Sequence, residues 1–137
     1  MTDWQDITTW HVLIVDDEIA NREVFAETLQ YFGAHVMSAS NGIEALDLIR
    51  QQLPTIILTD LAMPKMDGWE MLRILRADPD LRHIPVLVIT AAYTLPGDRE
   101  RVLAAGFDGY LMKPVEIATF ADVLRETISK ARRRDSA

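Results

Sequence analysis

Residues 55–68 have the sequence TIILTDLAMPKMDG, in which an apolar, β-branched run leads into an aspartate at position 60. Prolines at positions 54 and 64 leave this run too short for a typical helix, so it predicts a strand buried on both faces. The strand places Asp60 at its carboxyl end, the edge of an open parallel sheet where ligands bind. Asp60 is therefore a candidate site residue, and the alternative is that it caps the following helix.

Length and composition favour one domain. A chain of 137 residues is long enough to bury a hydrophobic core as a single domain, and no second domain is needed. The sequence has no cysteine and no apolar run that resembles a membrane span or a signal peptide, so a cytoplasmic location is the default expectation. Asp and Glu outnumber Lys and Arg by 21 to 14, giving a net charge of -7. That sign argues against direct binding to nucleic acid.

Strand-like and helix-like segments alternate five times. Besides residues 55–60, strands are predicted at residues 11–15, 34–40, 86–91 and 108–114. Each is followed by a segment with apolar residues at helical spacing. The residues expected to face the sheet are Val24, Phe25, Leu29, Phe32, Ala45, Ile49, Leu53, Met71, Leu72, Leu75, Ile117, Phe120, Ala121, Leu124, Ile128 and Ala131. This alternation requires a parallel sheet with helices on both faces, so the fold class is doubly wound α/β.

The two ends of the chain are set apart from this pattern. Residues 1–10 show no clear period and are expected to form a lead-in that packs Trp4 or Trp10 on the body. The organised domain is expected to cover residues 11–132, and residues 133–137 a C-terminal tail. The basic run at residues 130–134 is interpreted as a solvated helix end, where positive charge suits the helix dipole.

Polar residues follow or end four of the five predicted strands, at the same edge of the sheet. They are Asp16, Asp17, Asp60, Thr90 and Lys113. Neighbouring carboxylates repel one another and stay ionised only if a cation compensates for them. A ligand set made only of oxygen favours a hard ion such as Mg²⁺. A fixed ammonium at Lys113 would suit a phosphoryl group carried on Asp60.

With these motifs at these spacings, the sequence resembles the receiver domains of two-component response regulators. The resemblance rests on the pair Asp16-Asp17, the segment 60–68, the pair Thr90-Ala91 and the pair Lys113-Pro114, and it covers residues 11 to about 132. It implies a flavodoxin-like fold whose five-stranded parallel sheet has the order 2-1-3-4-5. It also implies a cis peptide bond before Pro114.

The resemblance further implies a phosphoacceptor that is not an enzyme in its own right. Asp60 would take a phosphoryl group from a sensor histidine kinase or a histidine phosphotransfer protein, with Lys113 and Thr90 assisting. The ligands of Mg²⁺ would be Asp17, Asp60 and the backbone carbonyl of Ala62. Asp16 would act mainly through a metal-bound water. Such chemistry needs charge neutralisation and in-line positioning more than covalent help from the protein.

The output implied by the resemblance is a change in protein binding. Thr90 would turn toward the phosphoryl group and Tyr110 would move inward, although by sequence alone Tyr110 is an ordinary strand aromatic. The partner face would be the fourth helix, fifth strand and fifth helix, and the loop 92–97 would change most. No output domain follows the last helix, so a stand-alone receiver is expected, either monomeric or dimerising on phosphorylation, with no direct role for nucleic acid or membrane.

Two alanines depart from the polar residues that many receivers carry beside the phosphoryl group. They are Ala62 and Ala92, two residues after Asp60 and Thr90 respectively. A methyl group can neither orient a water for hydrolysis nor close the site, so an intermediate lifetime of the acyl phosphate is expected.

Three other functions are alternatives to this one. A phosphatase of the haloacid-dehalogenase type needs a second Asp two residues after its nucleophile, and that position here is Ala62. A dinucleotide-binding domain needs a glycine-rich phosphate loop, and no GxGxxG or GxxxxGK[ST] motif follows a strand. The serious alternative is a receiver-like interaction module that works without phosphorylation. The presence of the acid pair, Asp60, Thr90 and Lys113 argues against it.

Overall fold

The computed structural model describes residues 3–91 and 96–136, and five strands and five α-helices alternate along them. The strands are β1 (His11–Val15), β2 (His35–Ala39), β3 (Ile56–Thr59), β4 (Val86–Thr90) and β5 (Gly109–Met112). The helices are α1 (Ile19–Tyr31), α2 (Gly42–Gln51), α3 (Gly68–Ala77), α4 (Asp98–Ala105) and α5 (Ile117–Ser136), and a short 3₁₀ helix, η1, covers Ile7–Thr9.

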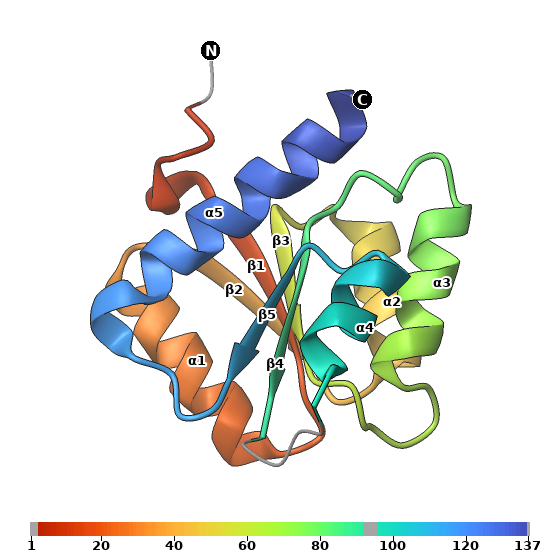
Figure 1. Cartoon of the computed structure of the whole chain (residues 1–137). Coiled ribbons are helices and arrows are strands. Elements are labelled where there is room, and N and C mark those ends of the chain that lie inside the picture. Colours follow the sequence, from red (N-terminus) through yellow and green to blue (C-terminus); the bar gives the residue numbers. More distant parts are fainter. Residues whose placement is uncertain (1–2, 92–95, 137) are drawn as a thin grey trace.

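The strands form one parallel sheet in the order β2-β1-β3-β4-β5 (Figure 1). This confirms both the doubly wound α/β class and the strand order that the family resemblance implies. Strand ends differ from the predictions by one or two residues, and β5 is shorter than predicted at both ends. The Lys113-Pro114 peptide bond is cis, also as implied.

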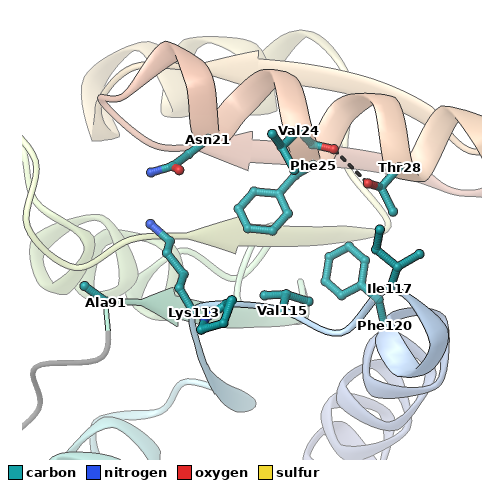
Figure 2. Close-up of a pocket in the computed structure, with 10 residues that line it drawn as sticks. Asn21, Val24, Phe25, Thr28, Ala91, Lys113, Val115, Ile117 and Phe120 are labelled. Atoms are coloured by element: carbon teal, nitrogen blue, oxygen red, sulfur yellow. Dashed lines mark hydrogen bonds between the residues drawn. The ribbon is translucent and has the colours of Figure 1, made fainter.

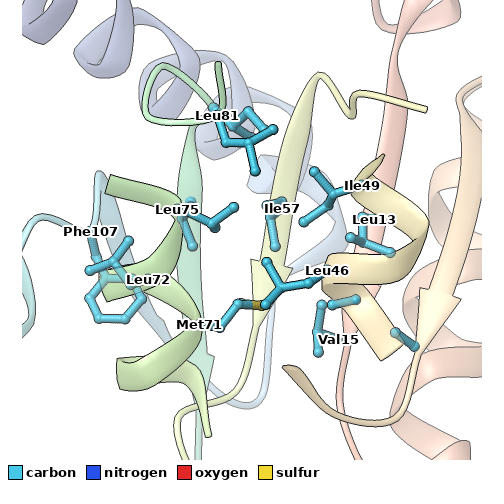
Figure 3. Packing of buried hydrophobic residues seen from close by; sticks show 14 of the residues in the cluster. Leu13, Val15, Leu46, Ile49, Ile57, Met71, Leu72, Leu75, Leu81 and Phe107 are labelled. Atoms are coloured by element: carbon cyan, nitrogen blue, oxygen red, sulfur yellow. The ribbon is translucent and has the colours of Figure 1, made fainter. Parts of the chain in front are cut away.

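Helices α1 and α5 cover one face of the sheet, and α2, α3 and α4 cover the other (Figure 1). Successive residues of β1 point to opposite faces, so Val12 and Ile14 join the core under α1 and α5. Leu13 and Val15 join the core under α2 and α3, which Figure 3 shows. Burial on both faces explains why the central strands are continuous apolar runs.

Side-chain caps begin the two helices that flank β3. The Asn41 side chain accepts a hydrogen bond from the Glu44 backbone N–H at the start of α2 (3.0 Å). Asp67 accepts one from the Glu70 backbone N–H at the start of α3 (2.9 Å). Since Asp67 caps α3, the alternative that Asp60 serves as this cap is wrong.

Three residues predicted to face the sheet are exposed instead. The exposed fractions are 58% for Val24, 52% for Leu53 and 59% for Ile117. Leu53 lies beyond the end of α2 at Gln51, so the helical period no longer applies to it. Val24 and Ile117 lie at the rims of α1 and α5, where they line one surface groove.

The N-terminal lead-in packs on the body, as predicted. Trp10 is completely buried, and its indole Nε1–H donates to the Trp4 carbonyl (2.8 Å). The Arg125 guanidinium of α5 lies 5.9 Å from the Trp10 ring centroid and donates to the Gln5 carbonyl (2.9 Å). Helix α5 and the lead-in are therefore fastened to each other.

Within the described ranges, no helix combines the length and the apolar composition that crossing a lipid bilayer requires. The cytoplasmic location stays a prediction.

The basic end of α5 is not simply solvated, which corrects the sequence interpretation. Arg134 Nε donates to Oδ1 of the buried Asp108 (3.0 Å). The other carboxylate oxygen, Oδ2, accepts from Arg76 Nη2 (2.9 Å) and the Val86 backbone N–H (3.0 Å). Helix α5 also continues to Ser136, past the expected start of the tail. Helical periodicity cannot show this anchor because Asp108 is 26 residues away.

Replacing Asp108 with Ala is expected to lower the free energy of unfolding by about 3–5 kcal/mol, since it leaves two partly buried guanidinium groups without their anion. Urea unfolding measures the change. Asp122→Ala is the matched control, because the Asp122 side chain is 80% exposed and forms an ion pair with Arg125 of the same helix. The control should lose no more than about 1 kcal/mol. Equal losses in both variants would contradict the anchoring role of Asp108.

Candidate functional site

The ends of three strands bring Asp16, Asp60 and Lys113 together. Lys113 Nζ lies 3.2 Å from Asp16 Oδ2 and 3.4 Å from Asp60 Oδ2. The Asp16 side chain is only 5% exposed, whereas those of Asp60 and Lys113 are 19% and 20% exposed. Because β5 is separated from β3 by β4, Lys113 reaches these carboxylates across the carboxyl edge of the sheet.

The charge state of Lys113 follows from its surroundings. Partial burial is the largest single effect and favours the neutral amine, but the charges and hydrogen bonds of Asp16 and Asp60 together outweigh it. The pKa of Lys113 is therefore raised above its ordinary value. At neutral pH the site holds a fixed ammonium between two carboxylates.

Donors from the start of α1 hold Asp16 in place. Its Oδ1 accepts from the Glu18 backbone N–H (2.9 Å), and its Oδ2 accepts from Asn21 Nδ2 (3.3 Å) as well as from Lys113. Arg22 Nη1 donates to the Asp16 backbone carbonyl (2.6 Å). Asn21 and Arg22 belong to no sequence motif that predicted a site residue. Their only signal is that they lie on the first turn of the helix that follows the acid pair.

The segment after β3 folds back over Asp60. The Leu61 backbone N–H donates to Asp60 Oδ1 (2.7 Å), and the Gly68 backbone N–H donates to the Leu61 carbonyl (2.9 Å). A Cβ at Gly68 would lie 2.5 Å from the Asp60 carbonyl oxygen, so only glycine permits this approach. The glycine that ends the segment 60–68 thus shapes the turn that carries Asp60.

The other predicted site residues lie around this cluster. Asp17 and Ala62 are exposed, and Thr90 is half-buried at the end of β4. The Thr90 backbone carbonyl accepts from the Lys113 N–H (2.7 Å). Tyr110 packs against the core under α2, α3 and α4, and its buried hydroxyl has no hydrogen-bond partner in the described part of the chain. Ala92 and most of the loop 92–97 lie outside the described residues.

The site offers a magnesium ion two converging carboxylates, Asp16 and Asp60, and no third acidic or histidine side chain in the described residues. Among residues 3–91 and 96–136, no group of three or more His, Cys, Asp or Glu side chains is close enough together to hold a metal, so Asp16, Asp17 and Asp60 do not form one. Two carboxylates do converge, and every donor atom is oxygen. Mg²⁺ commonly binds through one or two carboxylates and keeps several waters, so this donor set fits that ion.

A groove of about 480 Å³ opens beside Lys113, between α1 and the connection from β5 to α5. Figure 2 shows Asn21 and Lys113 at one end of this groove and Phe120 and Ile117 toward the other. Its remaining lining residues are Val24, Phe25, Thr28, Ala91, Pro114 and Val115. The groove places an apolar surface directly next to the charged cluster.

Residues 12–125 match the family model of the response regulator receiver domain. The chain belongs to this family. The receiver is 35% identical over 120 residues to the polar-differentiation response regulator DivK of Brucella anthropi, a match that covers 88% of this chain and 97% of DivK. Its function is therefore that of a receiver in two-component signalling.

Solved structures agree with this assignment. The receiver superimposes on the signal receiver domain of a histidine kinase from Syntrophus aciditrophicus with a TM-score of 0.80 and 32% identity, covering 91% of this chain and 94% of that one. The receiver domain of a sensor histidine kinase from Pseudomonas aeruginosa PAO1 gives a TM-score of 0.78 and 33% identity, with coverages of 88% and 98%. That crystal structure has a magnesium ion coordinated in its active site cleft.

The ion pairs of Lys113 predict how the stability of this receiver depends on pH. Because the pKa is raised on folding, their contribution is complete below the ordinary lysine pKa of 10.5 and is lost as the pH rises through the raised value. We expect the free energy of unfolding of the parent to fall relative to that of Lys113→Met only above about pH 10.5. Urea unfolding of both proteins at pH 7 to 12 measures this difference. Lys130→Met, which removes an exposed pair with Glu126, is the control. A difference that is constant with pH would contradict the ion pairs.

Proposed function

We propose that this receiver accepts a phosphoryl group on Asp60 from a phosphohistidine donor, and that phosphorylation changes which protein it binds. The observation that carries the proposal is the Lys113 ammonium, which lies between Asp16 and Asp60 at the carboxyl edge of the sheet. A fixed positive charge beside an accessible carboxylate is what an anionic phosphoryl group requires.

Asp60 suits the role of acceptor better than Asp16. The Asp16 carboxylate is almost completely buried, and three donors from α1 and β5 already occupy its oxygens. Asp60 is more exposed, and within the described residues Lys113 is the one side chain that donates to its Oδ2. An in-line transfer needs an oxygen that the donor can approach, so Asp60 is the accessible acceptor.

In the transfer, an Asp60 carboxylate oxygen forms a bond to phosphorus while the bond from phosphorus to the donor imidazole nitrogen breaks. Lys113 and the Thr90 hydroxyl would contact the phosphoryl oxygens and offset their charge. We assign the Mg²⁺ ligands to Asp17, Asp60 and the Ala62 carbonyl, with Asp16 acting through water. When bound, the ion supplies further charge neutralisation. This ligand set is the one that the family resemblance implies, and the magnesium ion in the active site cleft of the Pseudomonas aeruginosa relative supports Mg²⁺ as the ion.

The partners follow from this chemistry. The donor would be a sensor histidine kinase or a histidine phosphotransfer protein, and the target a protein that binds α4, β5 and α5. Tyr110 lies on β5 between two shallow grooves, one bounded by α4 and the other by α5. The Tyr110 hydroxyl is buried without a hydrogen-bond partner among the described residues, which costs free energy. Tyr110 would therefore change position when Thr90 is drawn toward the phosphoryl group. The receiver would act as a monomer or as a dimer formed on phosphorylation.

Intact-mass spectrometry after incubation with acetyl phosphate and Mg²⁺ tests the acceptor. The parent should gain one phosphoryl group and Asp60→Asn none, while both stay folded. Asp47→Asn is the control, because Asp47 is an exposed acid on α2 whose ion pair is with Arg50 of the same helix. Uptake by Asp60→Asn would relocate the acceptor. A parent that takes up nothing would instead favour the interaction module that works without phosphorylation.

Hydrogen exchange with and without beryllofluoride, a stable phosphoryl mimic, tests the output face. Protection should change in α4 and β5, and β2 at the opposite edge of the sheet should not respond. Lys113→Met should still bind Mg²⁺. Its change in protection on adding beryllofluoride should be at least about tenfold smaller than that of the parent, because the mimic no longer has its ammonium contact. A change confined to other elements would place the output face elsewhere.

A further inference from the structure

The buried carboxylate of Asp16 has two donors on the same oxygen. Lys113 Nζ lies 3.2 Å from Asp16 Oδ2, and the side-chain amide nitrogen of Asn21 lies 3.3 Å from it. The other oxygen is already held by the Glu18 backbone N–H. If Lys113 moved away, Asn21 would be the remaining donor to Oδ2 among the hydrogen bonds of the described residues.

Movement of Lys113 follows from the proposed function. The ammonium sits between Asp16 and Asp60 and must turn toward the phosphoryl group once Asp60 carries one. Leaving a buried acceptor without a donor costs about 1–3 kcal/mol, and more when the acceptor is charged. With the Asp16 side chain 5% exposed, bulk water cannot freely replace the lost contact, and a water held by Mg²⁺ would serve only part of the carboxylate. A donor that is already in place would keep Asp16 Oδ2 hydrogen-bonded as Lys113 departs.

Asn21 is held where such a donor must be. The next residue, Arg22, donates both to the Asp16 carbonyl (2.6 Å) and, through its backbone N–H, to the Glu18 carbonyl (3.2 Å), which fixes the first turn of α1 against Asp16. The second N–H of the Asn21 amide can serve Glu18 Oε2, which is also 3.3 Å away. Figure 2 shows that Asn21 faces the same end of the groove as Lys113, from the opposite wall.

We propose that Asn21 is a positioning residue that keeps Asp16 hydrogen-bonded while Lys113 passes from Asp16 to the phosphoryl group on Asp60. The contact of 3.3 Å is at the long end for an N–H···O bond, as expected while Lys113 occupies the same oxygen, and it shortens when Lys113 leaves. A neutral amide suits this role because it satisfies the carboxylate without adding a charge that would compete with Lys113 for the phosphoryl group. This proposal rests on the phosphoacceptor function above.

A double-mutant cycle tests the proposal through the rate of phosphorylation by acetyl phosphate and Mg²⁺, followed by intact-mass spectrometry. Asn21→Ala should slow phosphorylation about tenfold in the parent. In the Lys113→Met background the same substitution should change the rate less than about twofold, because no ammonium is left to be released. Asn21→Gln, which keeps the amide, should recover most of the rate. Gln30→Ala, which removes an exposed amide from the same helix, should have no effect.

The outcomes separate this inference from the function on which it rests. If the parent is not phosphorylated on Asp60, the proposed function fails. If the parent is phosphorylated and Asn21→Ala matches its rate, only the role of Asn21 fails. An equal slowing by Asn21→Ala with and without Lys113 would show a merely structural role and would also overturn the proposal. Should Asn21→Ala not fold, Asn21→Leu replaces the amide with an apolar side chain of similar size and should slow phosphorylation in the same background-dependent way.

Discussion

The Lys113 ammonium between Asp16 and Asp60 is the interaction on which the site depends. The two carboxylates end neighbouring strands, β1 and β3, and without a cation their charges would repel one another. Their compensating charge comes from the far side of β4, so the cluster exists only if the sheet is completed in the order observed. The charges of the two carboxylates are therefore compensated only when β5 is in place beside β4.

Strand β5 is fastened by ion pairs at both of its ends. Asp108 precedes it and meets Arg76 and Arg134, and Lys113 follows it and meets the two site carboxylates. An edge strand pairs along one side only, so side-chain anchors matter more for it than for the central strands. Tyr110 lies between the two anchors. In the proposed function, β5 is the element through which a change at Lys113 would reach the surface formed with α4 and α5.

Much of this architecture was predictable because it follows from local pattern. The continuous apolar runs are strands buried on both faces, and the helices between them require parallel pairing, which sends all strand ends to one edge. That logic placed Asp16, Asp60 and Lys113 at a common edge before any contact was known. The strand order came from the family resemblance instead, because periodicity does not distinguish one order of parallel strands from another.

The fold class and the residues at the strand ends follow from the sequence alone, since these depend on which neighbours along the chain are apolar. The partners of these residues are visible in the folded structure and not in the sequence. It showed that Arg134 reaches Asp108, that Asn21 shares an oxygen of Asp16 with Lys113, and that Val24 and Ile117 face a groove rather than the sheet. Hydrophobic periodicity reports which side of a helix turns inward, but it carries no information about a charge or an amide many residues away. Those contacts form only when the helices pack on the sheet.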